Sequence, residues 1–74
     1  MNDSVLSALL TTALTNYAAA NGTVRGNVLT LLGLSDYSVL PVNRQVEVLQ
    51  LKGIDAFRAL STANRDQLFT LLGM

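Results

Sequence analysis

The 74-residue sequence contains neither cysteine nor histidine. Disulfides and structural zinc sites, which stabilise many domains of this size, are therefore excluded. The same absence removes the arrangements in which histidine or a thiolate acts in nucleophilic catalysis. The single lysine, Lys52, has Leu49 three residues before it, so a Ser-x-x-Lys pair is missing as well. We predict that the protein is not an enzyme and that it binds no metal and no cofactor.

Charge is also scarce, since only 14% of the residues are charged and the net charge is zero. The cations do not form the basic stripe that is typical of nucleic-acid-binding proteins. They are Arg25, Arg44, Lys52, Arg58 and Arg65. The carboxylates are equally dispersed, and we interpret Asp3 and Asp55 as helix caps and not as a catalytic pair. Nucleic acid and small-molecule substrates are therefore not expected as partners.

The uncharged stretch 4–24 raises the possibility of a signal peptide or a membrane span. The leader Met1–Ser4 is acidic, whereas a signal peptide begins with basic residues. Threonine and asparagine interrupt the apolar run well before the roughly 20 residues that a span requires. We predict no signal peptide and no membrane span, and we expect a cytoplasmic or virion-associated protein.

Apolar spacing predicts an all-α fold, a small bundle of four or five short helices in a single domain over 1–74. Asp3 and Ser4 are expected to cap a first helix that ends near Ala20, before Asn21-Gly22. Thr23 is expected to cap a second helix that runs through Leu32 and stops at Gly33, with Leu34 folding back onto it. Gly26, inside this second helix, predicts a close approach of another helix.

The second part of the chain is less regular. Residues 35–40 read as a turn or short helix, and Pro41 favours a helix start. Residues 44–52 also alternate like a strand, but no partner strand exists, so we predict a helix ending at Gly53. Asp55 would then cap a short helix to Leu60, and Ser61 or Thr62 a last helix ending at Leu72-Gly73. The apolar stripes of these helices form the predicted core: Leu6, Leu9, Leu10, Ala13, Leu14, Tyr17, Val24, Val28, Leu31, Leu32, Val42, Val46, Leu49, Leu68, Leu71 and Leu72.

A segment of similar sequence occurs twice, 40 residues apart. Thr30-Leu31-Leu32-Gly33 matches Thr70-Leu71-Leu72-Gly73, and Arg25 matches Arg65. One interpretation is two copies of a helical hairpin, about 4–34 and 42–74, that bury their apolar faces against each other. The other is chance, because leucine-rich helices that end in glycine resemble one another.

Hydrophobic residues make up 50% of the chain, and the mean hydropathy is +0.39. A chain this short has too little interior to bury all of them. We therefore predict a protein-interaction or assembly module that binds a protein partner or itself, such as a small structural component of a phage or virus particle. The alternatives are a small helix-turn-helix nucleic-acid-binding regulator and a small protein inhibitor or adaptor. The candidate contact residues are Tyr37, Val39, Leu40, Val48, Leu51, Phe69 and Met74.

Overall fold

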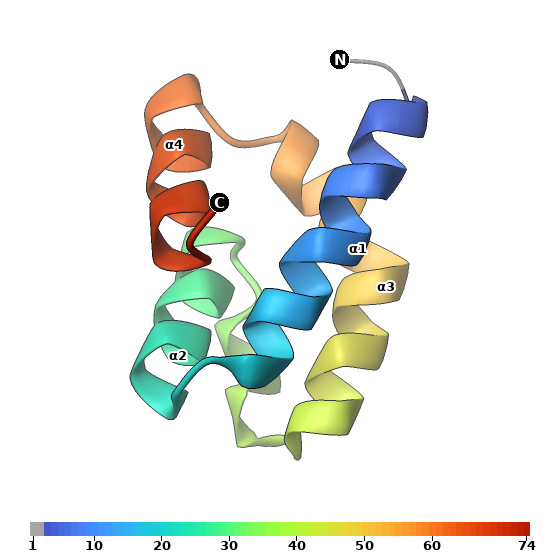
Figure 1. The fold of residues 1–74 in the computed structure, drawn as a ribbon. Helices are drawn as coiled ribbons and strands as arrows, with labels where there is room; N and C mark the ends of the chain where they lie inside the picture. Colours follow the sequence, from blue (N-terminus) through green and yellow to red (C-terminus); the bar gives the residue numbers. More distant parts are fainter. Residues whose placement is uncertain (1–2) are drawn as a thin grey trace.

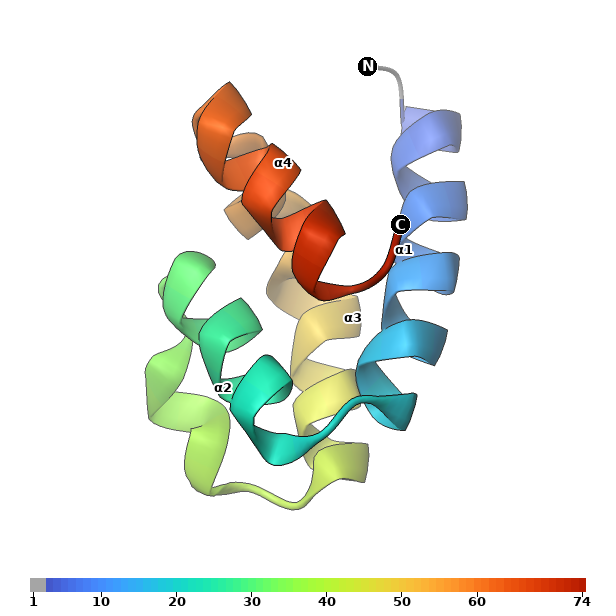
Figure 2. The same ribbon diagram turned by 60° about the vertical axis from the view of Figure 1, so that its left-hand side comes forward.

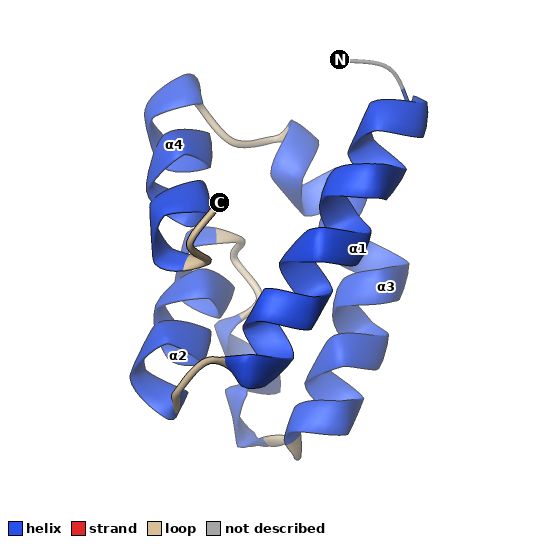
Figure 3. Ribbon diagram, viewed as in Figure 1, coloured by secondary structure: helices blue, strands red, loops and turns tan. Residues whose placement is uncertain are grey.

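A computed structural model describes residues 3–74, and all of its regular structure is helical. The elements are α1 (Asp3–Ala19), α2 (Gly22–Leu31), the short 3₁₀ helix η1 (Ser35–Val39), α3 (Val42–Arg58) and α4 (Thr62–Leu71). No strand is present among these described residues (Figure 3). The predicted all-α fold is therefore confirmed, and residues 44–52 are helical.

The helices pack mainly across the two parts of the chain. α1 lies against α3, and α2 lies against α4 and η1 (Figures 1 and 2). Tyr17, Val28, Leu29, Leu49 and Leu68 are buried in the core between these pairs, together with Leu72. Each main helix pair thus combines one helix from 3–34 with one from 42–74, and the shared core depends on both.

Leu29 is the core residue that the predicted stripes missed. Its side chain is 0% exposed, although the predicted stripe of the second helix contained Val24, Val28, Leu31 and Leu32. Because α2 packs against α4 on one side and η1 on another, its buried face is broader than a single stripe. Among the predicted core positions, Leu6, Tyr17, Val28, Leu49, Leu68 and Leu72 are buried.

The start of α2 differs from the prediction. Asn21, not Thr23, caps α2: its side-chain oxygen accepts a hydrogen bond of 2.9 Å from the Val24 N–H, so Gly22 is already helical. Asparagine is one of the strongest N-cap residues, which explains the earlier start. Ser61, one of the two caps predicted for the last helix, caps α4 and accepts from the Asn64 N–H at 3.2 Å. The cap expected from Asp3 lies outside the side chains that the structure describes.

The predicted break at Gly53 is wrong. α3 continues through it to Arg58, so Asp55 lies inside this helix and caps none. Gly53 is buried, and a Cβ atom at this position would lie 3.5 Å from Cδ1 of Leu10 in α1. A Cβ at Gly26 would meet no atom within 4 Å, so the close approach predicted there is also wrong. The small residue at the helix–helix contact is Gly53, where α1 and α3 meet.

The ends of α2 and α4 have the predicted geometry. Gly33 and Gly73 have φ angles of 71° and 68°, a conformation that side chains with a Cβ rarely adopt. The N–H of Leu34 donates to Leu29 O at 2.8 Å, and the N–H of Met74 donates to Phe69 O at 2.8 Å. These are Schellman-type helix ends, in which the chain folds back over the last turn.

Candidate interaction surfaces

Three of the predicted contact residues have exposed side chains. Val39 at the end of η1 is 86% exposed, Leu51 in α3 is 83% exposed, and Met74 is 39% exposed. The three residues belong to different parts of the fold, so the exposed members of the predicted set do not lie in one segment of the chain. Val39 and Leu51 are too exposed to contribute to the core.

The other four predicted contact residues are half-buried. They are Tyr37, Leu40, Val48 and Phe69. Tyr37 and Leu40 belong to the η1 region, which packs on α2 and α3, while Val48 lies one turn before Leu51 on α3. Phe69 contacts Phe57, with ring centroids 5.5 Å apart. Part of the predicted set therefore stabilises the fold, and Val39, Leu51 and Met74 are the exposed part.

The outer face of α3 has an apolar centre between two ion pairs. Arg44 and Glu47 form one pair, with 2.9 Å between Nη1 and Oε2. Arg58 and Asp55 form the other, with 3.9 Å between Nη1 and Oδ1. Leu51 lies one turn after Glu47 and one turn before Asp55, so both pairs border it along the helix. An apolar centre with a charged border is the usual anatomy of a protein–protein contact.

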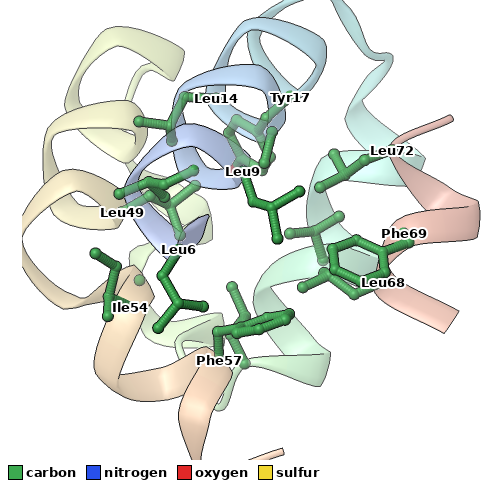
Figure 4. A pocket seen from close by; sticks show the side chains of 15 residues that line it. Leu6, Leu9, Leu14, Tyr17, Leu49, Ile54, Phe57, Leu68, Phe69 and Leu72 are labelled. Atoms are coloured by element: carbon green, nitrogen blue, oxygen red, sulfur yellow. The ribbon is translucent and has the colours of Figure 1, made fainter. Parts of the chain in front are cut away.

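A small apolar pocket lies between α1, α3 and α4. Leu6 and Leu9 point into it from α1, while Phe57 and Phe69 close it from α3 and α4 (Figure 4). Its volume is about 60 Å³, less than half of the roughly 150 Å³ of an apolar cavity that takes benzene. It is lined by Leu6, Leu9, Leu10, Ala13, Leu14, Tyr17, Val28, Leu32, Leu49, Gly53, Ile54, Phe57, Leu68, Phe69 and Leu72. The space is suited to one aliphatic group and not to a ring-sized ligand.

A buried polar link connects α1 to the start of α3. The Tyr17 hydroxyl donates to Oε1 of Gln45, and both residues are at most 5% exposed. Nε2 of Gln45 donates to the carbonyl oxygens of Ser38 and Leu40, at 3.1 and 2.8 Å. Burial raises the pKa of Tyr17 above 10.0, and the positive charge of Arg25 opposes this shift. Sequence reasoning missed Gln45, because one glutamine among polar helix residues carries no signal of burial.

A scan against protein-family models and searches of curated proteins and of solved structures found no match.

Two of the arginines bind helix ends. Arg25 donates to the carbonyl oxygen of Ala20, just beyond α1. Arg65 donates to the carbonyl oxygens of Phe57 and Arg58 at the end of α3, at 3.3 and 2.9 Å, and its guanidinium lies 5.0 Å from the centre of the Phe57 ring. A cation at a helix C-terminus satisfies free carbonyl groups and stabilises the helix dipole. These contacts give both arginines a structural role.

The carboxylates in the described part of the chain are not clustered. No group of three or more carboxylates lies close enough there to hold a metal ion. None of the helices described is both long and apolar enough to cross a membrane. The surface feature with a definite pattern is the α3 face around Leu51.

Proposed function

We propose that the protein is a non-catalytic interaction module that binds another protein chain through exposed apolar side chains. The observation that carries this proposal is Leu51, which is 83% exposed at the centre of a helix face bordered by two ion pairs. Single exposed leucines are common on protein surfaces, so exposure alone would carry little weight. The arrangement of apolar centre and charged border supports the proposal.

The energetics favour the same function. Fully burying a leucine side chain stabilises a fold or a complex by roughly 1.5–3 kcal/mol. Because Leu51 is exposed, it contributes little of this free energy to the stability of the fold. Val39, at the end of η1, is 86% exposed and likewise contributes little to the stability of the fold. A partner that covers either side chain would gain this free energy on binding. A small structural component of a larger assembly, such as a virus particle, is the form of this function that the apolar composition favours.

Site-specific photo-crosslinking tests the proposal directly. A photoreactive phenylalanine analogue is placed at position 51 or 39 of the full chain in its own cells, and at exposed Asn27 in α2 as the control. We expect a discrete crosslinked protein band from position 51 and none from position 27. Equal crosslinking at both positions, or none at 39 and 51, would contradict the proposed function.

The mass of the crosslinked product also separates the forms of this function. Twice the mass of the chain indicates assembly with itself, whereas another mass indicates a different partner, as expected for an inhibitor or adaptor. Nucleic acid as the partner would instead give a nuclease-sensitive product. The proposed function requires a protein in the band.

A further inference from the structure

We infer that the partner of the α3 face is a second copy of this chain, bound with the two α3 helices antiparallel; this inference rests on the proposed function. The surface consists of Arg44, Val48, Leu51 and Asp55, and we name it the α3 stripe. The four residues are spaced by four, three and four positions, which places them along one side of the helix. Leu51 is exposed and Val48 is half-buried, so the stripe is open at its centre.

The order of residues along the stripe is self-complementary. Read in one direction it is arginine, valine, leucine, aspartate, and read in the other it is aspartate, leucine, valine, arginine. In an antiparallel pair with its two-fold axis between Val48 and Leu51, each Val48 faces Leu51 of the second copy. At both ends, Arg44 faces Asp55 of the second copy. A two-fold contact of this kind uses the same surface on both chains and closes on itself.

The intrachain ion pairs extend this complementarity. Within one chain Arg44 contacts Glu47 at 2.9 Å, and Asp55 lies 3.9 Å from Arg58. When Arg44 meets Asp55 of the second copy, four charges of alternating sign come together at each end of the contact. A parallel arrangement would place Arg44 beside Arg44, and like charges in contact disfavour association. The charge order therefore selects the antiparallel pair.

The expected dimer is weak. One pair of helix faces buries less than the roughly 1,600 Å² of a standard stable interface. We expect a monomer–dimer equilibrium with a Kd on the order of tens of micromolar. Because charged side chains on the surface contribute to it, the equilibrium shifts toward monomer as the salt concentration rises.

Sedimentation velocity of the full chain from about 1 µM to 1 mM tests the apolar centre of the stripe. Leu51→Lys is expected to raise the dimer Kd by at least about tenfold. Asn27→Lys is the control, because Asn27 is also exposed but lies on α2, outside the stripe, and it should leave the Kd unchanged. Circular dichroism confirms that both variants keep their helical content.

Charge reversal tests the antiparallel geometry. Arg44→Asp alone and Asp55→Arg alone each place like charges at both ends of the contact, and each should raise the Kd about tenfold. When the two single variants are mixed, opposite charges face each other again across a mixed dimer, and the Kd should return to within about threefold of the original. A change that acted only on the folding of one chain could not be repaired by mixing.

The outcomes separate this inference from the proposed function. A dimer that is insensitive to Leu51→Lys, or one that mixing does not restore, overturns the antiparallel α3 contact. A chain that stays monomeric up to 1 mM also overturns it, yet crosslinks from position 51 to a different protein would still support the proposed function. Loss of both the dimer and the crosslinks would contradict both.

Discussion

The ends of α2 and α4 share their sequence and local geometry but not their surroundings. Leu32 N–H donates to Val28 O and Leu72 N–H to Leu68 O, each at 3.1 Å. After Gly33 the chain continues into η1, and Leu34 packs against the core. After Gly73, the side chain of Met74 is 39% exposed. Local sequence thus determines how a helix ends, while neighbouring elements determine what that end buries.

The same contrast appears inside the two helices. Leu29 in α2 is fully buried, whereas Phe69, at the matching position in α4, is half-buried at the edge of the apolar pocket. α2 packs against both α4 and η1, whereas α4 packs mainly against α2. The first copy of the repeated segment is therefore more central to the core than the second.

The largest effects that test this contrast are expected from Leu29→Ala and Phe69→Ala. Leu29→Ala is expected to destabilise the fold by about 3–5 kcal/mol, because the cavity it leaves is enclosed on all sides. Phe69→Ala removes a larger side chain but should cost only about 1–2 kcal/mol, since the residue is already half-exposed. Urea denaturation measures both values. A greater loss at Phe69 would contradict the assignment of α2 as the more central helix.

Tyr17 and Phe57 are also at matching positions, and Tyr17→Phe makes the first copy resemble the second. The variant leaves Oε1 of Gln45 buried without its donor, which should cost about 1–3 kcal/mol. Tyr37→Phe, at the half-buried tyrosine of η1, is the control and should cost less. An equal loss in both variants would show that the buried link contributes nothing of its own.

The buried hydroxyl of Tyr17 also predicts a pH dependence. Because its pKa is raised in the folded chain, the folded state retains the phenolic proton where the unfolded state has lost it. Stability from this group is therefore complete below pH 10.0 and declines as the pH rises toward the folded pKa. Denaturation curves between about pH 9 and pH 11 should show a steeper decline in the parent chain than in Tyr17→Phe. Parallel declines would contradict the effect.

Smaller effects are expected at Gly33 and Gly73, the two glycines that follow helix ends. Gly33→Ala forces a residue with a Cβ into a positive φ and should cost about 1–2 kcal/mol. Gly73→Ala creates the same local strain, but Met74 is 39% exposed where Leu34 packs against the core, so this helix end can unwind at a cost below about 0.5 kcal/mol. Thermal unfolding midpoints of the two variants would measure the difference. Equal shifts would mean that Met74 is held as firmly as Leu34.

The smallest effect is expected at the glycines inside helices. Gly26→Ala should stabilise the protein by about 0.5–1 kcal/mol, because alanine favours helix and the new Cβ meets no other atom. Gly53→Ala should gain less, since its Cβ would contact Leu10 at 3.5 Å. Urea denaturation at high precision measures both. A larger gain at Gly53 would contradict the close contact between α1 and α3.

Sequence reasoning predicted the features that depend on neighbouring residues. Gly33 and Gly73 end helices, Ser61 caps α4, and the helical spacing of 42–49 was interpreted correctly. Each of these depends on contacts within a few residues, which the order of the chain contains. The choice of Asn21 over Thr23 as a cap was missed, because both residues are good caps and lie two positions apart.

The features that depend on tertiary contacts were not predictable in the same way. Gly53 resembles a helix stop until α1 is packed against it, and Gly26 resembles a packing site until its surroundings prove open. Gln45 was missed for the same reason, because its burial requires Tyr17 to arrive from α1. Leu51 was predicted as a contact residue and is exposed, but the two ion pairs that border it were not predicted, because they depend on side-chain geometry.

The bond from Nδ2 of Asn16 to the carbonyl oxygen of Leu72, 2.9 Å long, joins residues separated by 56 positions. Together with the pairing of α1 with α3 and α2 with α4, it has a consequence for synthesis. In a chain emerging from the ribosome the residues of α1 and α2 come first, but neither helix has its main partner until the second half follows. Leu72 directly follows α4, the last helix, so this bond can form only after the rest of the fold has been synthesised. The unfinished chain exposes its leucines throughout that time, which places the period of greatest aggregation risk during synthesis.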